Sequence, residues 1–100
     1  MLLCLLPLAL AGDPVAGKVV YEANCTACHG LVADGTGPAA IALHVKPTNF
    51  TISAWWSTRT DTDVAAASRS GKPGTPMTAF AQLTDVQISD TVSYLRGLAR

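Results

Sequence analysis

Three residues that could do chemistry lie within one pentapeptide, in the order Cys-x-x-Cys-His: Cys25, Cys28 and His29. Residues three and four apart share one face of a helical turn, so both thiols and the imidazole can point to one side of the backbone. The two thiols could add across the two vinyl groups of a porphyrin while the imidazole reaches its iron. The spacing therefore predicts covalent attachment of one haem c through Cys25 and Cys28, with His29 as the proximal iron ligand.

Three other uses of these residues remain open at the level of sequence. A thioredoxin-like redox pair requires a strand-helix-strand context that the sequence does not show. A zinc site, or another non-haem metal site, needs four ligands, and His44 is the one further Cys or His outside residues 1–11. A disulfide between Cys25 and Cys28 would leave His29 without a role. Haem attachment is favoured because it uses all three side chains.

The length and composition of the chain indicate one small domain with no net charge. The chain has 100 residues, with seven Lys and Arg against seven Asp and Glu, so its formal charge is zero. No basic field would attract nucleic acid or anionic lipid, and we exclude nucleic acid as a partner. A domain of about 100 residues has a limited core, so a covalently attached cofactor would help to stabilise it.

The first eleven residues are predicted to form a secretory signal. They are apolar and end in Ala9-Leu10-Ala11, an A-x-A cleavage site, although no Lys or Arg precedes the apolar run. The alternative is an uncleaved tail, which at about ten residues is too short for a bilayer that requires about 20. Cleavage would remove Cys4, and the bulky Leu3 before it disfavours lipid attachment there. We therefore expect an exported, periplasmic protein whose single domain comprises residues 12–100, with no membrane span in the mature chain.

The remaining chain is predicted to be all-α, with three main helices, short helical turns and long loops. The first helix is expected over residues 14–25, after Asp13 as its N-cap and with the Cys-x-x-Cys-His motif at its end. Thr60 opens a second helix that stops at Gly71, and Thr84 with Gln87 forms a capping box before the last helix. A short turn is expected at residues 39–44, and Ser53 is expected to cap another that holds Trp55 and Trp56. Loops of this length suit a chain wrapped round a cofactor.

Met77 is the predicted second iron ligand. It is the sole Met beyond the initiator, and Pro76 restricts the backbone immediately before it. A thioether opposite an imidazole stabilises ferrous iron and is typical of electron-transfer haem proteins. The alternatives are a Met that fills a gap in the core and ligation by His44 instead. His44 follows the motif by only fifteen positions and would have to cross a glycine-rich loop and the ring edge.

The chain resembles the small single-haem class I cytochromes c over nearly all of residues 12–100. The similarity lies in the attachment motif and in segments on either side of it: Gly17, Tyr21, residues 25–30, 34–40, 46–47, 74–77 and 94–95. It implies a cytochrome c-like fold around one covalent haem.

The resemblance also implies roles for individual residues. It implies that the backbone carbonyl of Pro38 accepts a hydrogen bond from His29, and that Gly17 meets Tyr94 where the first and last helices cross. Candidate pocket walls are Phe50, Trp55, Trp56, Phe80 and Leu83, each of which could equally be ordinary core. Candidate propionate contacts are Thr48, Arg59 or a Trp indole.

These observations predict an electron carrier rather than an enzyme. With His29 and Met77 both on the iron, no coordination position is open to a substrate, so the haem would cycle between ferric and ferrous states. The expected partners are redox proteins that bind transiently to a monomer, and the three lysines, Lys18, Lys46 and Lys72, make no basic docking ring. The alternatives are a haem subunit of a larger oxidase or dehydrogenase, and a small-ligand-binding enzyme or sensor from which Met77 dissociates.

Overall fold

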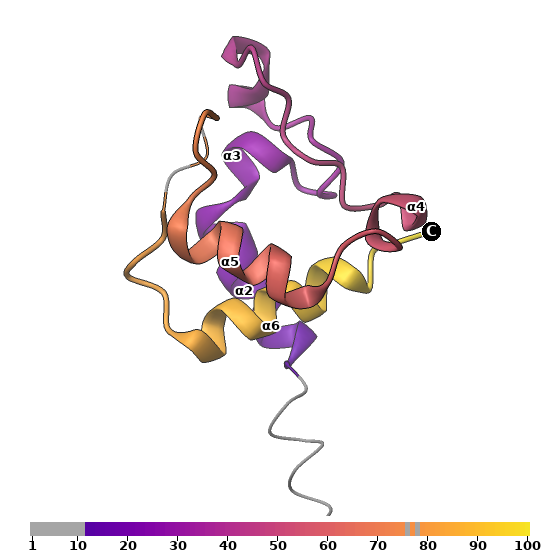
Figure 1. Ribbon diagram of the computed structural model, residues 1–100, viewed down its shortest axis with the longest axis vertical. Helices are drawn as coiled ribbons and strands as arrows, with labels where there is room; N and C mark the ends of the chain where they lie inside the picture. Colours follow the sequence, from indigo (N-terminus) through magenta and orange to yellow (C-terminus); the bar gives the residue numbers. More distant parts are fainter. Residues whose placement is uncertain (1–11, 76, 78) are drawn as a thin grey trace, which may run out of the picture.

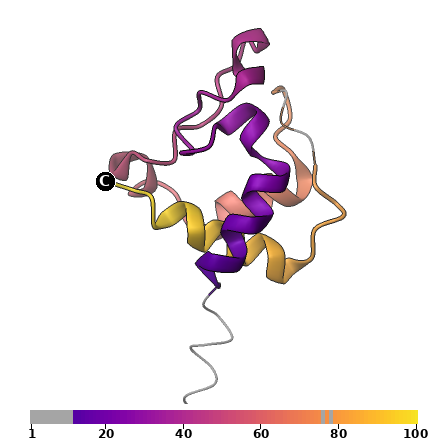
Figure 2. The same ribbon diagram turned by 180° about the vertical axis from the view of Figure 1, so that it is seen from behind.

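The computed structural model describes residues 12–75, 77 and 79–100, and within these ranges every regular element is helical. The predicted export segment with its cleavage site, Cys4 and Pro76 lie outside the described residues. The predicted all-α class is confirmed. The elements, which Figures 1 and 2 show from opposite sides, are α2 (Pro14–Asn24), α3 (Thr26–His29), the 3₁₀ helix η2 (Pro38–Ala42), α4 (Ser53–Trp56), α5 (Asp61–Ser70) and α6 (Asp85–Arg96).

The start of α2 agrees with its sequence signal. The Asp13 carboxylate accepts hydrogen bonds from the N–H groups of Val15 and Ala16, and Pro14 occupies the first turn. The end differs from the prediction, because Cys25 has φ −121° and ψ −18°, away from helical values. This departure separates α2 from α3, so the attachment motif forms a short helix of its own instead of the last turn of the first helix.

The capping signals of the two later helices also hold in the structure. The Thr84 hydroxyl accepts the Gln87 N–H, and the Gln87 side chain accepts the Thr84 N–H, as predicted for α6. A second reciprocal pair, Thr60 with Asp63, opens α5. Each box satisfies two N–H groups that a helix end would otherwise leave without partners.

The predicted cap by Ser53 was wrong. The N-cap of α4 is Ile52, and no side chain hydrogen-bonds to this helix start. The backbone N–H of Ser53 donates instead to the Arg100 carbonyl at 3.2 Å, and the Arg100 N–H donates to the Thr51 carbonyl at 2.8 Å. The C-terminal residue thus holds the start of α4 in place through backbone pairing.

The core centres on the crossing of α2 and α6, which Figure 2 shows at the base of the molecule. A Cβ on Gly17 would overlap the Asp90 carbonyl, so Gly17 allows the two backbones to touch. The resemblance pairs Gly17 with Tyr94, and the atoms nearest to a Cβ on Gly17 are backbone atoms of Asp90 and Thr91, on the same helix as Tyr94. The Tyr94 ring packs against Tyr21, one turn further along α2, with ring centroids 5.6 Å apart.

A polar contact ties the same crossing together. The side chain of Asp90 is only 8% exposed and accepts the backbone N–H of Asp13 at 2.8 Å. Asp13 is also the cap of α2, so a single residue joins the start of α2 to the middle of α6. A buried carboxylate is costly unless it is hydrogen-bonded, and this contact supplies the bond.

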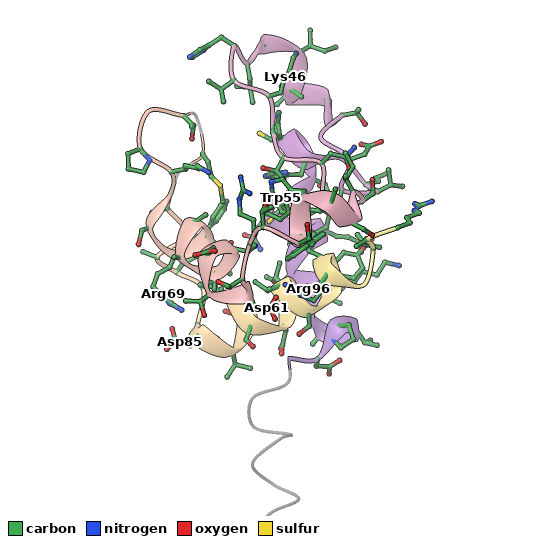
Figure 3. All side chains as sticks on the ribbon, turned by 45° about the vertical axis from the view of Figure 1, so that its right-hand side comes forward. Lys46, Trp55, Asp61, Arg69, Asp85 and Arg96 are labelled. Carbon is green, nitrogen blue, oxygen red and sulfur yellow. The ribbon has the colours of Figure 1, made fainter. Side chains whose placement is uncertain are left out.

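Two ion pairs align α5 with α6. Arg69 at the end of α5 lies 2.8 Å from Asp85 at the start of α6, and Arg96 at the end of α6 lies 2.6 Å from Asp61 at the start of α5 (Figure 3). The two helices therefore run antiparallel with a charge pair at each end. Such exposed pairs contribute about 0–1 kcal/mol each, so they help to select the alignment more than they stabilise the fold.

The described helices are all short. None of them has both the length and the apolar character needed to cross a membrane.

Replacing Gly17 with Ala tests the helix crossing. The added Cβ would meet the Asp90 backbone, which cannot rotate away as a side chain could, so we expect a loss of about 1–3 kcal/mol in the free energy of unfolding. Gly97→Ala is the matched control, because Gly97 has φ −66° and its nearest contact would be 3.4 Å. Chemical denaturation of both variants measures the difference, and equal midpoints would contradict the close crossing.

Candidate functional site

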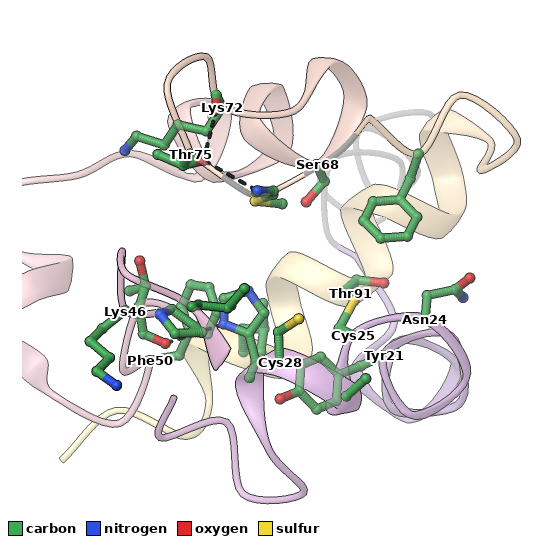
Figure 4. Close-up of a pocket in the computed structure, with 18 of the residues that line it drawn as sticks. Tyr21, Asn24, Cys25, Cys28, Lys46, Phe50, Ser68, Lys72, Thr75 and Thr91 are labelled. Carbon is green, nitrogen blue, oxygen red and sulfur yellow. Dashed lines mark hydrogen bonds between the residues drawn. The ribbon is translucent and has the colours of Figure 1, made fainter. Parts of the chain in front are cut away.

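The three residues of the attachment motif line one cavity, as their spacing predicts. Cys25 and Cys28 are half-buried free thiols, and the His29 N–H donates to the Cys25 carbonyl at 3.0 Å across one helical turn. Figure 4 shows both sulfur atoms on the lower wall of the cavity. Burial, with a smaller contribution from Cys28, raises the pKa of the Cys25 thiol to about 11. The thiol therefore stays protonated near neutral pH.

Backbone contacts hold the end of α3. The carbonyls of Cys28 and His29 accept the N–H groups of Gly37 and Gly35 at 3.0 and 2.8 Å. The next carbonyl, that of Gly30, accepts the Ala33 N–H at 3.1 Å and also the hydroxyl of Tyr21. The last carbonyls of a helix have no partner within it, and here the following loop and α2 supply those partners.

The His29 imidazole is arranged as a neutral ligand. Its Nδ1 lies 3.3 Å from the Thr48 carbonyl, which requires the proton to be on Nδ1 and leaves Nε2 with a free lone pair. Burial lowers the pKa of His29 below its ordinary value, and the bond to Thr48 opposes this shift only in part. A lowered pKa favours the uncharged ring near neutral pH, which is the form that binds a metal.

The carbonyl beside His29 belongs to Thr48 and not to Pro38, which corrects the role that the resemblance implied for Pro38. Pro38 is exposed, opens η2, and is not among the described residues that line the cavity. Thr48 reaches the ring because the Phe50 N–H donates to the Ala33 carbonyl at 2.8 Å. That bond holds residues 48–50 against the loop that follows the motif.

Met77 lines the same cavity, and its backbone is hydrogen-bonded to Lys72 and Thr75, which Figure 4 shows across the cavity from Cys25 and Cys28. The Met77 carbonyl accepts the Lys72 N–H at 3.1 Å. The Met77 N–H donates to the Thr75 hydroxyl at 3.3 Å (Figure 4). The Phe80 N–H donates to the Ser68 carbonyl at 3.0 Å, which joins the far end of this loop to α5. The Met77 segment is thus held across the cavity from α3, although the sequence separates them by almost half the chain.

His44, the rival ligand, lies elsewhere. It is exposed and is not among the described residues that line the cavities. Within the described part of the chain, no group of three or more His, Cys, Asp or Glu side chains could hold a metal ion together. Cys25, Cys28, His29 and His44 therefore do not assemble as a four-ligand metal site.

An aromatic cluster forms the side of the cavity next to His29. Phe50 is 7% exposed, with its ring centroid 5.0 Å from that of His29 and 5.4 Å from that of Trp55. The Trp56 indole N–H donates to the Phe50 carbonyl at 2.8 Å, so Trp56 supports the wall from behind. Trp55 continues outward to Arg59, whose guanidinium carbon lies 5.0 Å from its ring centroid. Of the predicted walls, Phe50, Trp55 and Phe80 line the cavities, whereas Trp56 and Leu83 belong to the core.

The cavity has two adjoining parts, of about 240 and 290 Å³. Six residues line both parts: His29, Thr48, Phe50, Ser68, Lys72 and Met77. Together the two parts reach the range of about 300–1,000 Å³ that is typical of small-molecule sites.

The chemistry of the two parts differs. The first part contains the two thiols among mainly apolar side chains, and the second contains Arg59 and Asp63 beside Trp55. Lys72 lies on the border of both. Haem has reactive vinyl groups at one edge and two negatively charged propionates at another. The thiols of the first part could bond to the vinyl groups, and the cationic side chains of the second part could pair with the propionates. The residues present therefore fit a haem c.

Comparisons with known proteins agree with this fit. The family model described as "Cytochrome c" matches residues 14–99. Cytochrome c-554(547) of Halothiobacillus neapolitanus is 33% identical over 95 residues, covering 88% of this chain and 99% of the relative. Two solved structures each match with a TM-score of 0.72 over 84% of this chain. The KustC0563 c-type cytochrome is 24% identical with 98% of its length covered, and a chain of the Kuenenia stuttgartiensis reducing HAO-like protein complex Kustc0457/Kustc0458 is 28% identical with 41% covered.

The two tryptophans offer a matched test of the aromatic wall. Trp56→Phe leaves the Phe50 carbonyl without the indole donor, so we expect it to cost about 1–3 kcal/mol more than Trp55→Phe. Both variants lose an indole that lies under an arginine, so the cation–π contribution largely cancels in the comparison. Denaturant unfolding of the two proteins measures the difference, and equal losses would show that the hydrogen bond does not support the wall.

Proposed function

The chain belongs to the cytochrome c family, whose members transfer electrons by means of haem, and we propose that it carries one electron at a time between redox proteins. The observation that carries this proposal is that Cys25, Cys28 and His29 line one cavity together with Met77, whose backbone is bonded to Lys72 and Thr75 across the cavity from the thiols. When bound, haem supplies an iron that alternates between the ferric and ferrous states.

The two thiols would hold the cofactor covalently. Each sulfur of Cys25 and Cys28 would add to one carbon of a vinyl group while the thiol proton goes to the other carbon, giving two thioethers. Each thiol supplies its own proton to the addition, so the reaction needs no further reactant, and both cysteines are free thiols. His29 would donate its Nε2 lone pair to iron while Thr48 keeps the ring orientation through Nδ1.

Met77 is proposed as the second axial ligand. Its place on the cavity wall and the two backbone hydrogen bonds that fix it support this role. A thioether stabilises ferrous iron, and a second protein ligand would leave no open position for oxygen or substrate. This arrangement supports an electron carrier that is not itself an enzyme.

Arg59 and Lys72 are proposed to face the haem propionates. Both line the second part of the cavity, and neither forms an ion pair with any described residue, whereas Arg69 and Arg96 do. The contact between Arg59 and the Trp55 ring restricts the guanidinium and so favours binding of a carboxylate. Of the earlier candidates, the Trp56 indole N–H already donates to the Phe50 carbonyl, whereas Thr48, whose hydroxyl could donate to a propionate, lines both parts of the cavity.

The partners are proposed to be redox proteins that bind a monomer through small, transient interfaces, below about 1,200 Å². The apolar segment ending in Ala9-Leu10-Ala11 supports export to the periplasm. A second candidate function is that of a haem subunit or domain of a larger complex. The likeness to a chain of the reducing HAO-like complex favours it, although this chain spans 41% of that longer polypeptide.

Purified protein from cells that export it and attach haem tests the proposal. We expect a pyridine haemochrome spectrum of a haem c with two thioethers, one haem per chain, and reversible one-electron titration. Carbon monoxide should not bind the reduced protein, because both axial positions are filled. A spectrum without haem would contradict the proposal, and ready binding of carbon monoxide would favour a ligand-binding enzyme or sensor.

Met77→Ala compared with His44→Ala tests the second ligand. The oxidised Met77→Ala protein should lose the sulfur-to-iron charge-transfer band and gain affinity for carbon monoxide when reduced, because its iron loses the thioether. His44→Ala should keep the band, since His44 is exposed and outside the cavity. The Met77 assignment is wrong if the band persists in the first variant or disappears in the second.

A further inference from the structure

Tyr21 is a fully buried residue with a polar end on the cavity wall. It is 0% exposed, it lies on α2 one turn before Cys25, and it lines the cavity. Its hydroxyl donates to the carbonyl oxygen of Gly30, the residue that directly follows His29. A ring at this position would fill the core equally well without a hydroxyl, so packing alone does not account for a tyrosine.

The carbonyl that Tyr21 binds lies at a turn of unusual shape. Gly30 has φ 89° and ψ 161°, a conformation that is essentially restricted to glycine. Its own N–H closes α3 by donating to the Thr26 carbonyl at 3.0 Å. The direction in which the chain leaves His29 is therefore set at Gly30, whose carbonyl oxygen accepts both the Tyr21 hydroxyl and the Ala33 N–H.

Among the described residues, Tyr21 supplies the one side-chain donor to the carbonyls of residues 28–30 at the end of α3. The neighbouring carbonyls of Cys28 and His29 are bound by backbone N–H groups of Gly37 and Gly35. Both of those donors belong to the loop that follows α3. Tyr21 belongs instead to the α2–α6 crossing, where its ring packs against Tyr94 at 5.6 Å, so its hydroxyl is a contact from the rigid core to the turn that bears the imidazole.

We propose that the Tyr21 hydroxyl is a positioning group for His29, fixing through the Gly30 carbonyl the orientation in which the imidazole meets the cofactor. This inference rests on the proposed function, because it takes His29 as the iron ligand. Thr48 holds the ring from its Nδ1 side, and Tyr21 holds the backbone from which the ring extends. The two contacts come from different segments and together restrict both the position and the rotation of the side chain.

Tyr21→Phe in the haem-loaded protein is the direct test, because it removes one oxygen and keeps the ring. Tyr94→Phe is the matched control: Tyr94 is the neighbouring tyrosine at the same crossing, and its hydroxyl forms no hydrogen bond with any described residue. We expect the Gly35 and Gly37 amide protons to exchange about two- to tenfold faster in Tyr21→Phe than in wild type, the range given by one net hydrogen bond. Tyr94→Phe should leave both rates unchanged.

Two readouts report on His29 itself. In Tyr21→Phe we expect the hyperfine-shifted imidazole protons of the ferric protein to move and the reduction potential to shift, whereas Tyr94→Phe should match wild type in both. The inference is overturned if Tyr21→Phe alters only the unfolding midpoint, or if the two variants change the imidazole signals equally. Failure of the proposed function would appear separately, as wild-type protein without haem or without imidazole signals from a ligated histidine.

Discussion

The direct contact between the backbones of α2 and α6 is the constraint on which the rest of the structure depends. Gly17 permits it, and Asp90 reinforces it by accepting the Asp13 N–H. Because α2 runs straight into Cys25, the angle and depth of this crossing decide where the motif begins. Tyr21 lies on α2 between Gly17 and Cys25, and its hydroxyl donates to the Gly30 carbonyl. This hydrogen bond links the helix crossing to the end of α3. The attachment site is therefore placed by the helical core and not by the loops alone.

Around this core, loops supply the functional surface. One loop carries Met77 and is held to the end of α5 by backbone hydrogen bonds, and another brings Thr48 and Phe50 to His29. Loops without regular structure are costly in a small domain unless their polar groups find partners. Here each loop has such contacts, and both face a cavity large enough for a cofactor whose apolar plate would complete the core.

Two details departed from expectation for the same physical reason. Pro38 was expected to face His29, and Ser53 was expected to cap α4. In both cases a contact from a distant segment is found in place of the expected one: Thr48 is held beside the ring by the bond between Phe50 and Ala33, and the Ser53 N–H is taken by Arg100. A local pattern shows which group needs a partner, and it does not show which distant group will reach it.

The sequence by itself determined the attachment motif, the helix starts at Asp13 and Thr84, and the all-α class. These depend on interactions within one or two helical turns, namely the i, i+3 and i+4 spacing and the capping residues, which the order of residues specifies directly. Only the tertiary structure decided that Thr48 orients His29, that Trp56 supports Phe50 and that Tyr21 binds Gly30. Those contacts join residues whose proximity depends on how the helices cross and where the loops return. Packing of the whole chain sets both, and no short stretch of sequence encodes them.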